Sequence, residues 1–161
     1  MIKIFFNYRH IQEPWGGANS FNRLLHKEIS KKKQFEITKN NNSANIIFMN
    51  GLSKGPAYKS KRTSYLEFQK LKKTGAKIII RAVNLHQHSH KHHFILAWQD
   101  FWQVKILNEA DFVIFQSEYQ RTVFLGAGFS NTDNCVIHNG ADGQLFQFIR
   151  KSLDKGKIRL V

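Results

Sequence analysis

The chain of 161 residues is 42% hydrophobic and 13% aromatic, which excludes intrinsic disorder and suffices for one domain with its own core. A net charge of +14, from 25 basic and 11 acidic side chains, predicts an anionic partner or reflects a solvated, lysine-rich surface. No apolar run approaches the roughly 20 residues of a membrane span, and residues 1–6 are too short and strand-like for a secretory signal. The single cysteine, Cys135, excludes an intrachain disulfide framework and fits a reducing cytosol.

The first elements predict a strand, a glycine-containing loop and a helix. Residues 3–8 form an apolar run typical of a buried strand, and residues 20–29 have the apolar spacing of an amphipathic helix. Gly16 and Gly17 lie in the loop between them, where exposed backbone N–H groups and a helix N-terminus can receive a phosphate. The pair is not a GxGxxG motif, and local sequence alone favours a tight turn without a ligand.

The middle of the chain continues the alternation of strands and helices. Strands are predicted at 35–38, 46–50 and 77–83, and the last of them contains Arg81 and is followed by Asn84. A helix is predicted at 59–73, with Tyr65, Phe68 and Leu71 facing inward and lysines outward. The aromatic-rich segment 94–109 is also helical in spacing, and we expect it to be mostly core.

A histidine-rich segment, residues 85–93, has three interpretations. Imidazoles bind zinc or nickel, but no cysteine or carboxylate accompanies them here, so no metal is expected. A solvated loop is the second interpretation. Alternatively, the first residues, including His86 and His88, line a cleft because they follow the end of a strand.

Residues 110–142 predict a complete strand–helix–strand unit. Residues 112–115 form a buried strand, Ser117 can cap the following helix and Glu118 suits its first turn. A second strand is predicted at 135–138, and Asn139-Gly140 then forms a turn.

This alternation predicts a single α/β domain: a Rossmann-like doubly wound parallel sheet in three layers, α/β/α. Ligands of such sheets bind beyond the carboxyl ends of the strands. We therefore expect six residues that follow predicted strands to gather at one edge: Gly16, Gly17, Asn84, His86, Ser117 and Asn139.

The motifs ADFVIFQSEY and VIHNGAD, the latter followed by Phe146, resemble the end of the N-terminal domain of GT-B glycosyltransferases of family 4. Ala141 stands where that family usually has Val or Ile. The resemblance extends over nearly the whole chain. It implies that residues 1–150 form the acceptor-side half, and that residues 151–161 form a linker and the first strand of a donor-binding domain that is otherwise absent.

The resemblance implies a retaining transferase that moves a sugar from a nucleotide-sugar donor to a sugar or lipid-linked acceptor. The nucleotide sugar is a substrate, and no cofactor is implied. Asn84 and His86 would be catalytic. Donor or acceptor binding would fall to a wider set: Gly16, Gly17, Arg81, His88, Ser117, Glu118, Asn139 and Gly140. The family's paired glutamate motif lies in the missing half, so we expect little or no transfer by this chain without a separate donor-domain chain.

Two alternatives stay open. In the first, the chain is a non-catalytic binding module or a truncated relic. In the second, it is a basic protein that binds nucleic acid or a membrane surface. The nucleic-acid alternative lacks the aromatic-basic motif of RNA-binding sheets and a helix-turn-helix pattern. The membrane alternative rests on the basic outer side of the helix predicted at 59–73, which makes the expected location cytoplasmic and peripheral to an anionic membrane.

Overall fold

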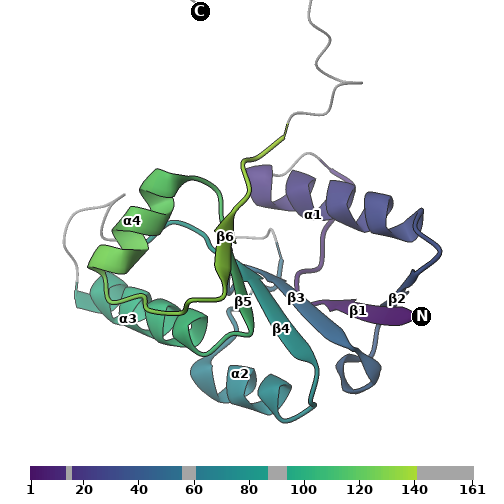
Figure 1. Ribbon diagram of the computed structural model, residues 1–161, viewed down its shortest axis with the longest axis horizontal. Coiled ribbons are helices and arrows are strands. Elements are labelled where there is room, and N and C mark those ends of the chain that lie inside the picture. Colours follow the sequence, from purple (N-terminus) through teal and green to yellow (C-terminus); the bar gives the residue numbers. More distant parts are fainter. Residues whose placement is uncertain (14–15, 56–60, 87–93, 141–161) are drawn as a thin grey trace, which may run out of the picture.

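The computed structural model describes residues 1–13, 16–55, 61–86 and 94–140. Within these ranges the protein contains one parallel sheet of six strands, in the order β2-β1-β3-β4-β5-β6 (Figure 1). The strands are β1 (Ile2–Phe6), β2 (Phe35–Thr38), β3 (Ile46–Asn50), β4 (Lys77–Arg81), β5 (Phe112–Phe115) and β6 (Asn134–Val136).

In the same described ranges, four α-helices flank the sheet: α1 (Gly16–Ser30), α2 (Tyr65–Lys72), α3 (Phe94–Asn108) and α4 (Glu118–Gly126). A short 3-10 helix, η1 (Asn41–Ser43), leads from β2 to β3. After β2 the chain crosses β1 and then adds every later strand on the other side, so the strand order reverses between β1 and β3. The predicted Rossmann-like, doubly wound parallel sheet is therefore confirmed.

One face of the sheet carries the hydrophobic core. Side chains alternate between the faces of a strand, and the fully buried set on this face is Ile47, Met49, Ile78, Ile80, Val113 and Phe115. They form one cluster with Phe68 and Leu71 of α2, Val104, Ile106 and Leu107 of α3, and Phe124 of α4. Helices α2, α3 and α4 therefore cover this face.

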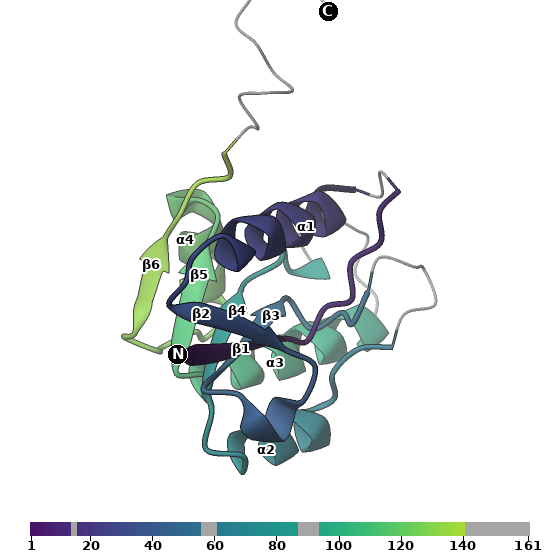
Figure 2. The same ribbon diagram turned by 90° about the vertical axis from the view of Figure 1, so that its right-hand side faces the viewer.

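Helix α1 covers the opposite face, over β1 and β3 (Figure 2). Its Phe21 ring lies 6.3 Å from Phe48 of β3, which in turn packs on Phe6 of β1. The deeply buried residues of α1 are nevertheless two asparagines, Asn19 and Asn22, both without exposed surface. The α1 face thus buries polar side chains beside Phe48, whereas the core face buries the apolar cluster.

Two helices begin at serine caps. Ser64 Oγ accepts from Glu67 N at 3.2 Å and the Glu67 carboxylate accepts from Ser64 N at 3.1 Å, which is a complete capping box at the start of α2. Ser117 Oγ accepts from Gln120 N at 3.1 Å at the start of α4, as the sequence predicts.

The helix predicted at 59–73 starts later than expected. Residues 61–63 are extended because they pair with residues 52–54: Lys54 N donates to Lys61 O, and Thr63 N to Leu52 O. Helix α2 therefore begins only at Tyr65. Phe68 and Leu71 are buried and Tyr65 packs against the core, as predicted.

The expectation that segment 94–109 is mostly core is wrong for its first half. Phe94, Ile95, Trp98 and Phe101 are between 55% and 83% exposed. The core-facing residues of α3 are instead Val104, Ile106 and Leu107, together with buried Asp100 and Gln103. A helix offers only about one third to one half of its surface to a sheet, and α3 has more apolar residues than that face can hold.

Three smaller boundaries also differ from the sequence predictions. Helix α1 begins at Gly16, so the glycine pair lies in its first turn rather than in a loop. Strand β4 ends at Arg81, and β6 ends at Val136 instead of His138. Residues 141–161, and with them the expected boundary at residue 150, lie outside the described residues. Among those described, no helix has the length and apolar character to cross a membrane.

Candidate ligand-binding site at the carboxyl edge of the sheet

Polar side chains meet where the parallel strands end. Asn50 is the last residue of β3 and Arg81 the last of β4, while Gln116 directly follows β5 and Asn139 lies three residues beyond β6. Because all strands run in one direction, these four residues reach the same edge of the sheet. Hydrogen bonds join them into a single network.

Arg81 is the centre of this network. Its Nη1 donates to Asn50 Oδ1 and its Nη2 to Asn139 Oδ1, both at 2.7 Å. The guanidinium carbon lies 4.1 Å from the centroid of the Phe21 ring of α1, a cation–π distance. Arg81 therefore ties β3, the segment after β6, and α1 together at one point.

The environment of Arg81 is unusual because it is buried without a carboxylate. Arg81 is 5% exposed, and no ion pair among the described residues includes it. Burial lowers the pKa of its guanidinium to about 10, which leaves it charged at neutral pH. Neutral amide oxygens and an aromatic face compensate this charge only in part, so the site has a net attraction for anions.

Side-chain amides extend the network toward α4. Asn139 Nδ2 donates to Gln116 Oε1 at 2.9 Å, and Gln116 Nε2 donates to Ala82 O at 2.9 Å. Gln120 of α4 accepts from Gln116 N at 2.8 Å and donates to Asn84 Oδ1 at 3.0 Å. Amides both donate and accept, so this arrangement is chemically suited to hydroxyl groups.

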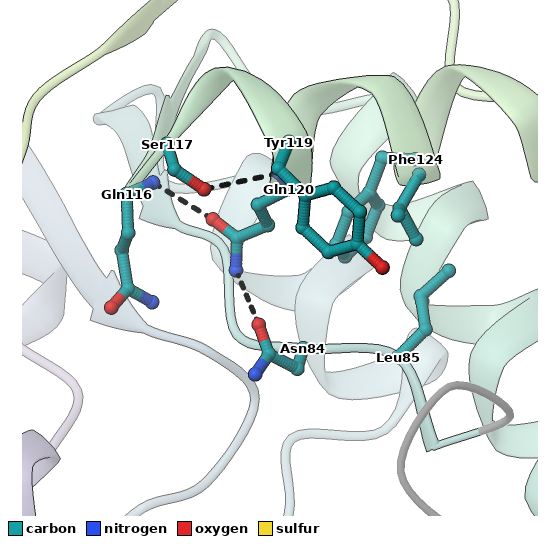
Figure 3. A pocket seen from close by; sticks show the side chains of 8 residues that line it. Asn84, Leu85, Gln116, Ser117, Tyr119, Gln120 and Phe124 are labelled. Atoms are coloured by element: carbon teal, nitrogen blue, oxygen red, sulfur yellow. Dashed lines mark hydrogen bonds between the residues drawn. The ribbon is translucent and has the colours of Figure 1, made fainter.

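A pocket of about 340 Å³ opens beside these amides. Figure 3 shows the Gln120 amide between Gln116 and Asn84, with an apolar side formed by Tyr119, Phe124 and Leu85. Ser117 and Val123 complete the lining. A pocket with one amide-lined side and one aromatic side fits a small polyhydroxylated ligand, whose ring faces are apolar and whose edges are polar.

The N-terminus of α1 borders the same edge. Gly16 has φ +63°, a conformation that favours glycine, and a Cβ at either Gly16 or Gly17 would meet no atom within 4 Å. The space at both glycines is therefore open. Asn19 fixes the preceding loop by accepting from Ile11 N and donating to Ile11 O and Glu13 O.

Buried Asn22 adds an unusual feature near the beginning of α1. Its Nδ2 donates to Ala18 O, the same carbonyl that accepts from Asn50 Nδ2. Its Oδ1 has no hydrogen-bond partner among the described residues, although Asn22 has no exposed surface. An unpaired buried acceptor costs about 1–3 kcal/mol, so this side of the edge is not optimised for stability.

His86 belongs to a separate cluster. Its Nε2 accepts from Arg62 Nη1 at 2.9 Å, and its backbone N donates to Asp100 Oδ1 at 2.9 Å. Arg62 also donates to Gln99 and Gln103 of α3. An imidazole nitrogen that accepts from a guanidinium carries no proton, which places the proton of a neutral ring on Nδ1.

The site residues predicted from sequence are thus divided. Arg81, Asn84, Ser117 and Asn139 lie in or beside the amide network, and Gly16 and Gly17 head the helix that contacts Arg81. Glu118 is exposed and pairs with Arg121 at 3.5 Å, away from the pocket lining, and Gly140 is exposed. His88 lies outside the described residues. Among those that are described, no three His, Cys, Asp or Glu side chains are grouped to hold a metal.

Sequence analysis missed Asn50 and Gln120, and it placed Gln116 at this edge of the sheet without a binding role. The signal for Asn50 was available, because it ends a predicted strand. Gln120 lies one turn into a helix and carried no such signal. Comparison with known proteins adds nothing to this description, since no protein-family model and no curated protein matches the chain.

Proposed function

We propose that the chain is the acceptor-side half of a family 4-like GT-B glycosyltransferase, completed by a donor-binding domain. The supporting observation is the Asn139 side chain, which bridges Arg81 and Gln116. These three residues come from the segments that carry the resemblance, VIHNGAD and ADFVIFQSEY, and from the strand before them. Separate motifs that converge on one network are expected of a shared ligand site.

The proposed reaction transfers a sugar with retention of its configuration. The acceptor oxygen bonds to the anomeric carbon, the bond from that carbon to the diphosphate breaks with its electron pair, and the acceptor proton leaves with the diphosphate or a nearby base. Positioning and stabilisation of phosphate charge supply most of the catalysis in such a cleft. The amides of Asn84, Gln116 and Gln120 would bind hydroxyl groups, and Arg81 would favour the anionic side of the ligand.

His86 is proposed as a catalytic residue because its imidazole lies near the same edge and is held in one orientation by Arg62. Gly16 and Gly17 would admit the donor diphosphate to the N-terminus of α1. The proposed location is the cytosol, with which the free Cys135 is compatible, and at an anionic membrane surface. Nucleic acid is not proposed as a partner.

Nuclear magnetic resonance of the purified chain tests the site. The side-chain amide signals of Asn84, Gln116, Gln120 and Asn139 should shift when monosaccharides or nucleotide sugars are added. Asn45 and Asn131, whose side chains lie at the opposite edge, serve as internal controls and should not move. Shifts confined to the controls, or no shift at millimolar sugar, would contradict the proposal.

An activity assay separates the transferase from a non-catalytic module. The chain alone should show weak or no transfer, and addition of a matching donor-domain chain should restore it. Sugar binding without transfer in the reconstituted pair would favour the alternative, a binding module. Transfer by the isolated 161-residue chain would contradict the view that it is only half of the enzyme.

A further inference from the structure

The side-chain amides at the carboxyl edge can be hydrogen-bonded in only one direction. Two groups of the network cannot exchange roles, because the guanidinium of Arg81 only donates and the carbonyl of Ala82 only accepts. Arg81 Nη2 donates to the oxygen of the Asn139 amide, and the nitrogen of that amide therefore donates to Gln116 Oε1. The nitrogen of Gln116 donates to Ala82 O at 2.9 Å. The orientation of both amides is thus fixed.

Gln120 is held in one orientation by two backbone groups. Its Oε1 accepts from Gln116 N at 2.8 Å, and its Nε2 donates to Ala82 O at 3.4 Å. A backbone N–H only donates and a carbonyl only accepts, so the nitrogen of Gln120 must also be the atom that faces Asn84. It donates to Asn84 Oδ1 at 3.0 Å. Because Gln120 is only 5% exposed, these bonds are protected from exchange with water.

The polar side of the pocket consequently presents unused donors. Figure 3 shows the oxygen of Asn84 turned toward Gln120 and its nitrogen turned away, and among the described residues no group accepts from that nitrogen. Gln116 Nε2 has a second N–H besides the one that it gives to Ala82 O. Ser117 Oγ accepts from Gln120 N, and its O–H has no acceptor within the described part of the chain.

The oxygens of the same side chains are already in use. Asn84 Oδ1 accepts from Gln120, Gln116 Oε1 from Asn139, and Gln120 Oε1 from Gln116 N. No carboxylate is present among the residues that line the pocket. A ligand group that accepts several hydrogen bonds and donates none matches this lining better than a hydroxyl, whose own O–H would compete for oxygens that already accept a bond.

We propose that the pocket selects a carboxylate or phosphate group of a small polyhydroxylated ligand, and that Gln120 is the positioning residue that sets this preference. Both groups are ionised acceptors, and charge-assisted hydrogen bonds to them are about twice as strong as those to a neutral group. Gln120 acts through Asn84, whose N–H donors it directs into the pocket. The inference rests on the proposed function, because it names the class of ligand for the same site.

Titration of the wild-type chain with three sugars tests the preference. Glucose, glucuronate and glucose 6-phosphate have the same ring and separate a neutral ligand from a carboxylate and a phosphate. At equal ionic strength, at least one of the two anions should bind about tenfold more tightly than glucose, and the tighter one identifies the anionic group. The side-chain amide signals of Asn84 and Gln116 report binding.

The variant Gln120→Glu tests the positioning role. At neutral pH the new carboxylate can still accept from Gln116 N, but it cannot donate to Asn84 Oδ1. The Asn84 amide should then turn over and donate to the carboxylate, so that its oxygen faces the pocket and the preference for glucuronate over glucose falls about tenfold. Acidification from about pH 7.5 to about pH 5 should restore the preference, because burial raises the pKa of a glutamate and its protonated form can donate to Asn84. The amides of the wild type do not titrate.

Exchange of side-chain amide protons with solvent gives an independent signature. In the wild type without ligand, the Nε2 protons of Gln120 should exchange slowly and the Nδ2 protons of Asn84 rapidly, and glucuronate should slow those of Asn84. In Gln120→Glu at neutral pH, the Asn84 protons should exchange slowly even without ligand. A merely structural loss would make them exchange faster.

Two further variants separate the direction of hydrogen bonds from charge. Asn84→Asp keeps an acceptor for Gln120 but replaces the N–H donors by an oxygen, so the preference for glucuronate should be lost at neutral pH. Thr122→Glu adds the same charge as Gln120→Glu at an exposed position of α4 outside the pocket lining, and its preference should stay within about twofold of the wild type. Thermal unfolding verifies that each variant is folded.

Three results would overturn the proposal while leaving the proposed function intact. The first is equal affinity of the wild type for glucose and for both anions. The second is an unchanged preference in Gln120→Glu at neutral pH. The third is an equal loss of preference in Thr122→Glu, which would mean that only net charge matters. If none of the three sugars binds, the proposed function fails together with this inference.

Discussion

The two faces of the sheet bury different kinds of side chains. On the face covered by α2, α3 and α4, side chains such as Phe68, Phe115 and Phe124 are completely buried in an apolar cluster. On the α1 face, the buried groups include Asn22, Asn50 and Arg81; among the described residues, the Asn22 Oδ1 acceptor has no partner and Arg81 pairs with no carboxylate. The core face therefore contributes most of the free energy of unfolding, whereas the polar groups that the α1 face buries at the carboxyl edge lower it.

The largest expected effect lies on the core face. Replacing Phe115 by Ala should lower the free energy of unfolding by about 3–5 kcal/mol, because a completely buried ring leaves a cavity among Phe124, Phe129 and Val113. Denaturant unfolding measures the loss. Phe21→Ala, which removes a half-buried ring from the α1 face, is the matched control. Equal losses for the two variants would break the distinction between the faces.

A smaller effect is expected for the buried cation. Arg81→Met should cost about 2–3 kcal/mol, because Asn50 Oδ1 stays buried without its charged donor, although removal of the desolvated charge offsets part of the loss. Arg81→Lys should cost a similar amount, since an ammonium cannot make the same planar pair of bonds. Denaturant unfolding measures both losses. If it found Arg81→Met more stable than the wild type, the network would contribute nothing to the stability of the fold.

The two serine caps sharpen the comparison further. Ser64→Ala and Ser117→Ala should each lower the free energy of unfolding by about 1 kcal/mol, because each removes an acceptor for a helix N–H. Only Ser117 lines the pocket, so only its variant should also shift the side-chain amide signal of Gln120. If both variants gave the same side-chain amide spectrum, the Ser117 cap of α4 would have no influence on the amides of the candidate site.

The smallest expected effect is the pH dependence of stability that Asp111 causes at the amino edge of the sheet. Partial burial by itself raises the pKa of Asp111, but hydrogen bonds from Ile78 N and Lys77 Nζ outweigh it and hold this pKa below its ordinary value of 3.8. Such a carboxylate stabilises the fold above its unfolded pKa, and the contribution is lost as pH falls through the lower, folded pKa.

Asp111→Asn should therefore be less stable than the wild type at neutral pH, and the difference should shrink below about pH 4. We expect a difference of about 1 kcal/mol or less, because both the aspartate and Lys77 reach solvent. Thermal unfolding across pH measures it. If the stability difference between the wild type and Asp111→Asn grew as the pH fell, the pH dependence would have to come from another group.

The strand–helix alternation was readable from the sequence because each strand is a short, continuous apolar run between polar turns. Runs such as Phe112–Phe115 can only be buried on both sides, and a parallel sheet provides this burial. The caps at Ser64 and Ser117 are equally local, since a cap needs only neighbouring backbone N–H groups. Residues that follow strands, such as Asn84 and Asn139, could be placed at one edge on the same grounds.

The contacts at that edge could not be read in the same way. The bond from Arg81 to Asn139 spans 58 residues, and the cation–π contact with Phe21 depends on how α1 lies across β3 and β4. Local pattern also failed for α3, where helical spacing suggested a buried helix but the sheet had room for only one of its faces.

The sequence by itself determined the class of fold, because burial of apolar runs and the chemistry of turns and caps act over a few neighbouring residues. Only the tertiary structure decided that Arg81 is a buried cation held by amides and that Trp98 and Phe101 are exposed. Both outcomes depend on how whole elements pack on the sheet. Helix α1 packs over the polar carboxyl edge and brings Phe21 against Arg81. Only one side of α3 can contact the sheet, so its remaining aromatic side chains are exposed to solvent.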